Sequence, residues 1–124
     1  MSLTDTVLAF TRTMEGLVAD GDPPDDWAPL AEFVALGDFE RVGTFREVQD
    51  WQQYMAMLTH WASSVDKFEA SVLRITEAAN LVFFEIEERH HRGGGVHVVN
   101  SMTVFDFDGN GKIRRLNVYL QQGR

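Results

Sequence analysis

The second half of the chain alternates between apolar and polar residues, and this period of two is the feature that most constrains the fold. From Val65 onward the alternation predicts a run of β-strands separated by short turns. The predicted strands span residues 67–76, 81–91, 96–107 and 113–122, with turns at 77–80, 93–95 and 108–111. Because turns this short cannot carry a crossover connection, we expect the strands to form an antiparallel meander.

The start of the chain shows a helical period instead. Apolar residues recur from Leu3 to Leu17 at spacings of three and four, which predicts an amphipathic helix over residues 4–20 that ends at Gly21. The segment that follows is rich in turn residues. For it we expect a loop at 21–26, a short helix at 27–33 capped by Asp25 or Asp26, and one or two short strands in 34–43 that turn at Gly37–Asp38.

A longer helix is predicted directly before the strands. Thr44 and Glu47 match a capping box, in which the two side chains satisfy backbone amides at the start of a helix. Behind them the apolar positions Val48, Trp51, Met55, Leu58 and Ala62 share one helical face. This pattern predicts one long capped helix over residues 45–62, which would cover the sheet together with the N-terminal helices.

Centring each turn gives a register for the sheet, and the register decides which side chains share a face. It pairs Ile75 with Val82, His90 with His97, and Phe107 with Lys112. The face predicted to pack on the helices carries the rows Leu73, Phe84, Thr103, Leu116; then Ser71, Ile86, Ser101, Val118; then Glu69, Glu88, Val99, Leu120; and last Lys67, His90, His97, Gln122. An apolar face with a few hydroxyls is typical of a small-molecule pocket. The register therefore directs Ser101, Thr103 and Phe105 inward and Met102, Val104 and Asp106 outward.

Composition and charge exclude several functions. A formal net charge of -8 repels phosphate backbones, so we expect no nucleic-acid partner. The chain has no cysteine, which excludes disulfides, thiolate metal ligands and thiol nucleophiles. No stretch has the pattern of a signal peptide, a membrane span or a basic amphipathic helix, so we expect a cytoplasmic protein with no membrane partner.

The order of the predicted elements and one motif resemble a known superfamily. The motif runs from Val104 to Ile113 as an aromatic strand, an acidic turn with glycines and a Lys–Ile pair, and Tyr119 closes the next strand. It resembles the last hairpin of the nuclear transport factor 2-like superfamily, which includes the ketosteroid isomerases and the SnoaL-like polyketide cyclases. The resemblance implies one SnoaL-like α+β domain over residues 1–124. In such a domain the helices close a cone-shaped, curved antiparallel sheet around a pocket, and the whole forms an α+β barrel.

The resemblance does not extend to the catalytic residues of the isomerases. Their oxyanion-hole acid falls on Thr103 here, and the tyrosine of their first helix falls near Phe10 or Met14. Their general-base aspartate falls within residues 34–38, where Asp38 is the only acid. The resemblance therefore implies the pocket of this family without its known chemistry.

The inner face of the predicted sheet supplies candidate site residues. Glu69 and Glu88 fall opposite each other, with His90 and His97 one row further, and adjacent carboxylates beside a histidine can exchange a proton. We therefore predict Glu88 and His90 as catalytic residues. The predicted substrate-binding residues are Ser101, Thr103, Phe84, Ile86, His97, Phe105, Leu116, Val118 and Trp51. The same cluster could instead bind a metal ion, or form a solvated rim in which Lys67 offsets the acids.

A second metal motif lies in the last turn. Asp106, Asp108 and Asn110 match the first half of a calcium loop. However, Asn117 occupies the position of the bidentate glutamate, and strands flank the loop instead of helices. We therefore expect a plain hairpin turn and no metal.

Two functions fit these features. The first is an isomerase, cyclase or dehydratase that acts on a small apolar carbonyl compound by acid–base chemistry without a cofactor. The second is a non-catalytic ligand-binding or interaction module with the same pocket. A small-molecule ligand is the expected partner in both. The outward apolar residues Phe83, Met102, Val104 and Tyr119 also predict a homodimer.

Overall fold

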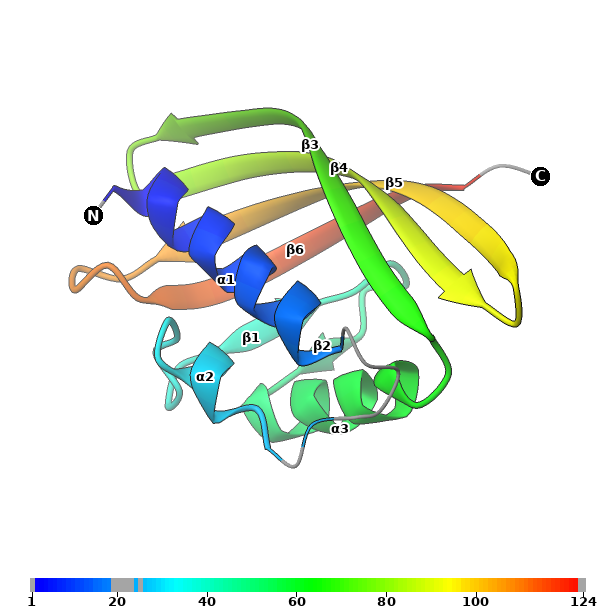
Figure 1. Ribbon diagram of the computed structural model, residues 1–124. Helices are drawn as coiled ribbons and strands as arrows, with labels where there is room; N and C mark the ends of the chain where they lie inside the picture. The colour runs from blue at the N-terminus through cyan, green and yellow to red at the C-terminus, as the bar shows by residue number, and fades with distance from the viewer. Residues whose placement is uncertain (1, 19–23, 25, 123–124) are drawn as a thin grey trace.

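A six-stranded, strongly curved sheet with helices on one face forms the centre of the protein (Figure 1). It is seen in a computed structural model that describes residues 2–18, 24 and 26–122. The strands are β1 Glu40–Val42, β2 Val48–Gln49, β3 Lys67–Ala78, β4 Leu81–Arg92, β5 Gly95–Phe107 and β6 Ile113–Gln122, in the order β2-β1-β6-β5-β4-β3. The predicted α+β class is confirmed. Within the described residues β2 and β3 are the two edges, so the sheet stays open instead of closing into a barrel.

The four strands predicted from the period of two are β3 to β6. They pair as the predicted antiparallel meander, and the turns between them lie where the sequence indicates. Gly93 and Gly94 have φ angles of 56° and 84°, which favour glycine, and they make the sharp turn between β4 and β5. The sequence pattern therefore determines most of the sheet.

α1, Leu3–Leu17, crosses the concave face of the sheet and contacts β3 and β4 (Figure 1). Ser2 and Asp5 form its capping box, in which each side chain bonds the backbone amide of the other. Its residues Val7 and Phe10 are buried. The predicted end of this helix near residue 20 lies outside the described residues.

The second helix is shorter than predicted. α2 spans only Ala28–Ala31, and its Leu30 is fully buried. Asp26 accepts a hydrogen bond from the amide of Ala28 at its start. The alternative cap, Asp25, and most of the predicted loop at 21–26 lie outside the described residues. None of the described helices is long and apolar enough to cross a membrane.

The long helix, α3, spans Trp51–Ala62 and begins later than predicted. Asp50 and Gln53 form its capping box. The predicted box of Thr44 and Glu47 is wrong, because these residues lie in the turn between β1 and β2. Two start signals follow one another in the sequence, and the pairing of β2 with β1 excludes the first of them.

The segment before α3 adds two short strands to the edge of the sheet. β1 runs parallel to β6, with Arg41 opposite Leu116, and β2 pairs antiparallel with β1. The predicted turn at Gly37–Asp38 is present. Because paired residues of neighbouring strands share a face, the side chain of Arg41 lies on the helix-covered side.

A β-bulge overturns the predicted register of β3. Ala70, not Glu69, lies opposite Glu88, and the register shifts between Val72 and Arg74. A displacement by one residue moves every side chain of a strand to the other face. The residues that lie on the outer face for this reason are Lys67, Glu69 and Ser71.

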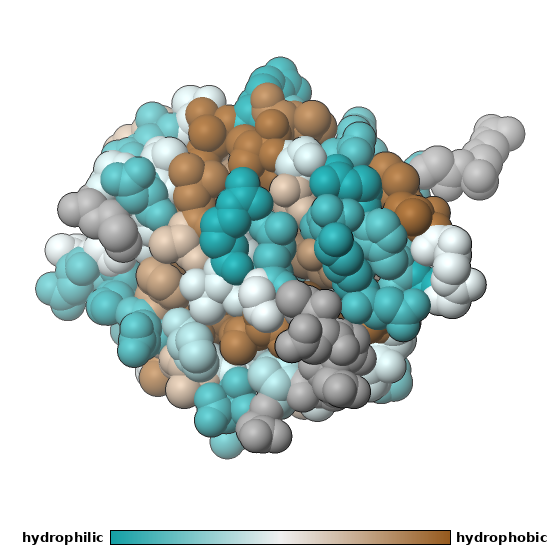
Figure 2. Space-filling model, viewed as in Figure 1, coloured by the Kyte–Doolittle hydropathy of each residue, from teal (hydrophilic) through white to brown (hydrophobic). Residues whose placement is uncertain are grey.

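The bulge also leaves two apolar side chains in solvent. Val72 and Leu73 are 36% and 47% exposed. The space-filling view shows apolar surface along the edge of the molecule beyond α1 (Figure 2). The extra residue therefore costs some apolar burial while it bends the edge strand.

The remaining registers keep the predicted faces. His90 lies opposite His97 as predicted, whereas Leu116 lies opposite Phe105 instead of Thr103. This second shift is by two residues, so it changes no face. The inward and outward sets of β5 are therefore confirmed: Ser101, Thr103 and Phe105 face the helices, and Met102, Val104 and Asp106 face away.

Candidate functional site

The curved sheet and the helices enclose a cavity of about 430 Å³. Small-molecule sites have volumes of roughly 300–1,000 Å³. Strands β4, β5 and β6 supply one wall, and α1 and α3 supply the other. The apolar lining includes Phe10, Leu58, Phe84, Phe105 and Leu116, and the polar lining includes Arg41, Tyr54, Glu88, His90, Arg92, His97 and Thr103.

Most of the predicted site residues line this cavity. They are Glu88, His90, Thr103, Phe84, Ile86, His97, Phe105, Leu116 and Val118. Ser101 and Trp51 are not among the lining residues. Ser101 is buried in the wall, where its Oγ has no hydrogen-bond partner among the described residues, and Trp51 packs edge-on against Phe39 and Tyr54.

A chain of hydrogen bonds runs from α3 to the cavity through His90. The indole Nε1 of Trp61 donates to Nδ1 of His90 over 3.2 Å, and Nε2 of His90 lies 2.9 Å from Oε1 of Glu88. A ring nitrogen that accepts the indole proton carries none of its own, so Nε2 holds the imidazole proton and donates it to Glu88. The His90 and Glu88 side chains are only 13% and 18% exposed. This chain orients a carboxylate at the cavity wall.

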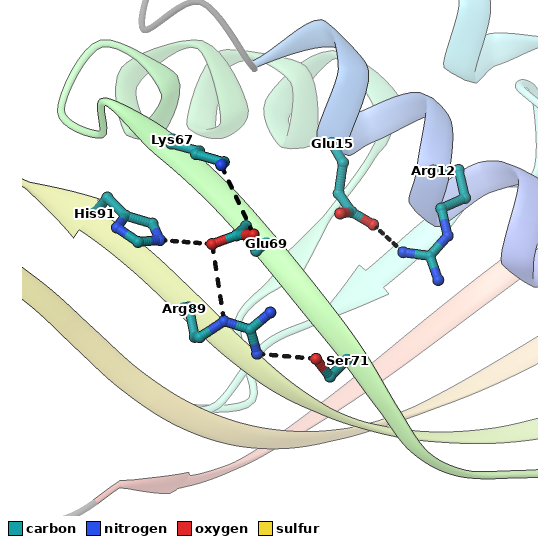
Figure 3. A network of polar contacts seen from close by, with 7 residues as sticks. All are labelled: Arg12, Glu15, Lys67, Glu69, Ser71, Arg89 and His91. Atoms are coloured by element: carbon teal, nitrogen blue, oxygen red, sulfur yellow. Dashed lines mark hydrogen bonds and ion pairs between the residues drawn. The ribbon is translucent and has the colours of Figure 1, made fainter.

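Glu69 lies on the opposite face of the sheet, in a separate network of charges (Figure 3). Its Oε1 lies 2.8 Å from Nε2 of His91, and its carboxylate lies 3.8 Å from both Lys67 and Arg89. The hydrogen bond with His91, reinforced by the positive charges, lowers the pKa of the Glu69 carboxyl. The predicted contact between Glu69 and Glu88 is therefore wrong, and its cause is the bulge in β3.

Tyr54 and Arg41 are cavity residues that were not predicted as part of the site. Tyr54, on α3, is 5% exposed, and the guanidinium carbon of Arg41 lies 5.4 Å from the centre of its ring. Burial raises the pKa of Tyr54 to about 12; the positive charge of Arg41 lowers it and the negative charge of Glu88 raises it. The phenol therefore stays protonated over the physiological range and can donate a hydrogen bond.

The sequence carries a signal for only one of these two residues. Tyr54 lies between Trp51 and Leu58 on the helix, so its hydroxyl is a polar tip on an apolar face. Arg41 lies in the segment without a clear period, and only the parallel pairing of β1 with β6 directs it inward.

The positions at which the resemblance places the isomerase catalytic residues bring no carboxylate to the cavity. Thr103, Phe10 and Met14 all line the cavity. Asp38 lies in an exposed turn and is not among the lining residues. The acid–base groups at the cavity wall are the Glu88–His90 pair, His97 and Tyr54.

In the described part of the chain, no group of three or more His, Asp or Glu side chains is arranged to hold a metal ion. In the last turn, Oδ1 of Asp108 accepts hydrogen bonds from the amides of Asn110 and Lys112. Oδ1 of Asp106 accepts from Asn80 and Arg114 instead. The acids of the calcium-like motif are thus engaged in closing the hairpin.

Solved structures share this architecture at low sequence identity. IdmH, a candidate polyketide cyclase from Streptomyces antibioticus, superposes with a TM-score of 0.77 at 13% identity, over 98% of this chain and 93% of its own. A nuclear transport factor 2-like protein from Anabaena variabilis gives 0.76 at 18% identity, over 96% and 89% of the two chains. An epoxide hydrolase from M. tuberculosis gives 0.74 at 17% identity, over 96% and 82%.

Sequence comparison adds no closer relationship. No protein-family model matches the chain, and no curated protein matches it significantly. The likeness therefore lies in the structure, over nearly the whole length of each neighbour. This chain has the fold of the nuclear transport factor 2-like superfamily, as its sequence predicts.

Proposed function

We propose that this chain binds a small, largely apolar carbonyl compound in the cavity and moves a proton within it, as an isomerase, cyclase or dehydratase does. The observation that carries the proposal is the hydrogen-bonded chain of Trp61, His90 and Glu88 at the wall of an apolar cavity. A positioned carboxylate with little water around it is suited to accept a proton from a bound substrate.

The proposed step uses Glu88 as the proton acceptor. Glu88 removes a proton from the carbon beside the carbonyl, the C–H electron pair forms a C=C bond, and the carbonyl π pair moves to oxygen. The hydroxyl of Tyr54 donates a hydrogen bond to that oxygen, and the hydroxyl of Thr103 is a second possible donor. In a substrate with a C=C bond next to the carbon that lost its proton, Glu88 returns the proton to the far carbon of that bond while the carbonyl re-forms. This completes an isomerisation, so no cofactor is consumed.

The structural neighbours support the class of reaction without naming a substrate. They include candidate SnoaL-like polyketide cyclases and an epoxide hydrolase. Both kinds of enzyme act on small organic molecules. The cavity of this chain, apolar with a few polar groups, suits ligands of that kind.

Turnover of small ketones and polyketide-like compounds by paired glutamine variants tests the proposal. Glu88→Gln should lower kcat by roughly a hundredfold or more, the scale of a lost general base. Glu87→Gln is the matched control, because Glu87 lies on the outer face and pairs with Arg89 at 3.0 Å. Equal turnover by both variants would remove Glu88 from the mechanism.

A non-catalytic ligand-binding module is the second candidate. The observation that favours it is the absence of an acid at Thr103, Phe10 and Met14, where the resemblance places the isomerase catalytic groups. Under this reading a ligand binds in the cavity and is recovered unchanged. Binding without turnover across the same compounds would establish this alternative.

We also propose that the outer face of the sheet joins two copies of the chain. Phe83 lies opposite Val104, and Met102 lies opposite Tyr119, so the four form a connected apolar strip. Phe83 and Tyr119 are 36% and 57% exposed in the single chain. Burial of this strip in a homodimer would remove that apolar area from water.

A further inference from the structure

Arg41 is a positive group of the cavity lining that the proposed proton transfer does not use. The side chain of Arg41 is half-buried and lines the cavity beside Tyr54. Its Nη1 donates a hydrogen bond to Oε1 of Gln49 over 3.0 Å. Among the described residues, no carboxylate oxygen lies within the 4.0 Å of an ion pair with Arg41. The guanidinium therefore has no ion pair within 4.0 Å, although the carboxylate of Glu47 lies close by, beside Gly43.

Two residues of the β1–β2 turn, Gly43 and Glu47, surround the guanidinium of Arg41 where it meets the cavity. The side chain of Glu47 approaches from the β1–β2 turn, and it shares the space beside Gly43 with Nη1 of Arg41. A Cβ on Gly43 would lie 1.6 Å from Oε1 of Glu47 and 2.9 Å from that nitrogen. The missing side chain of Gly43 is thus what allows Arg41 to take this position.

The cavity lining carries positive side chains although the chain as a whole is acidic. The chain carries a formal net charge of -8. The charged lining residues are Arg41 and Arg92 against Glu88, and Nε of Arg92 bonds the carbonyl of Ser64 at the rim. Arg92 is exposed, so the guanidinium of Arg41 is the partly buried positive charge of the lining, and it can attract an anionic ligand there.

We infer that the ligand of this cavity is an apolar carboxylate, bound by the guanidinium of Arg41. Guanidinium and carboxylate match in geometry, and their charge-assisted hydrogen bonds are about twice as strong as neutral ones. The ring of Tyr54 lies beside this guanidinium, and its hydroxyl remains the donor to the carbonyl oxygen of the same ligand. The inference rests on the proposed function and narrows it to keto acids or similar carboxylates.

Direct binding of carboxylates and their neutral amides tests this inference. We would titrate the full chain with octanoate, cinnamate and naphthoate, and with the primary amide of each, by calorimetry. The carboxylates should bind the wild-type protein about tenfold or more tightly than the amides, the usual scale of a hydrogen bond between charged groups. Arg41→Gln should abolish this preference, and Arg41→Lys should retain part of it.

Arg89→Gln is the matched control, because Arg89 lies on the outer face and pairs with Glu87. It should leave the preference unchanged. If Arg41→Gln fails to fold, the ratio of carboxylate to amide affinity in the wild-type protein still decides the question. Amides that bind as tightly as carboxylates would overturn the inference while leaving the proposed function intact. Absence of binding by both classes would overturn both.

Discussion

The indole nitrogen of Trp61 lies 3.2 Å from Nδ1 of His90 and donates a hydrogen bond to it. This contact joins the end of α3 to β4 at the cavity, and it determines which nitrogen of His90 faces Glu88 with a proton. Trp61 thus does more than pack in the core: through His90 it orients Glu88, the proposed proton acceptor.

Removal of this donor should weaken the site without removing the packing. In Trp61→Phe the ring can still pack against Phe68, which lies 5.1 Å away between ring centres, but Nδ1 of His90 loses its donor. With a substrate in hand, we expect kcat to fall roughly three- to tenfold, the worth of one neutral hydrogen bond, at nearly constant KM. A purely structural role would instead change stability and leave kcat unaltered.

The burial of Tyr54 predicts a loss of stability at high pH. Its pKa is about 12 in the folded chain against 10.0 for the free side chain. Between these values the unfolded chain releases a proton that the folded chain keeps, so stability falls as the pH rises through this window, by about 2–3 kcal/mol in all. Urea unfolding of the wild-type protein should show this slope, and Tyr54→Phe should lack it. Equal slopes would contradict the burial of the phenol.

The outer position of Glu69 predicts that it has no part in the site. Its pKa is lowered in the fold by the hydrogen bond with His91, so its contribution to stability is present above roughly pH 4.3 and is lost as the pH falls below that value. Glu69→Gln should leave turnover unchanged and reduce stability slightly at pH 7, with the difference shrinking near pH 3. If turnover fell as far as in Glu88→Gln, the outer position of Glu69 would be contradicted, and the two carboxylates would have to share one face of the sheet.

The apolar strip on the outer face predicts a dimer in solution. Val104→Glu would place a charge in the middle of this strip, and burial of an unpaired charge is costly. Light scattering at high micromolar concentration should give a dimer for the wild-type protein and a monomer for this variant. Leu36→Glu, at an exposed apolar site in a turn, should remain a dimer. A monomeric wild-type protein would contradict the proposal.

The period of two was sufficient to predict β3 to β6, because each strand has one face on the core. It could not locate the bulge at Leu73, since an extra residue there changes no local pattern and is read only from cross-strand pairing. That single residue decides whether Glu69 faces Glu88. Predicting strands from alternation is therefore more secure than predicting which side chains meet across them.

The start of α3 and the position of Arg41 share one physical cause. Thr44 with Glu47 and Asp50 with Gln53 are equally good local start signals, and only the pairing of β2 with β1 separates them. A different pairing, the parallel one of β1 with β6, directs Arg41 into the cavity. Both depend on contacts between segments far apart in the chain, which local propensity does not contain.

The tautomer of His90 shows whether Trp61 holds its ring toward Glu88. Long-range proton–nitrogen correlation spectra of the protein with ¹⁵N-labelled histidine distinguish a protonated ring nitrogen from a bare one. The hydrogen bonds from Trp61 and to Glu88 predict a proton on Nε2 and none on Nδ1. A proton on Nδ1 in the wild-type protein would contradict the account, because Trp61 could then not hold His90 toward Glu88.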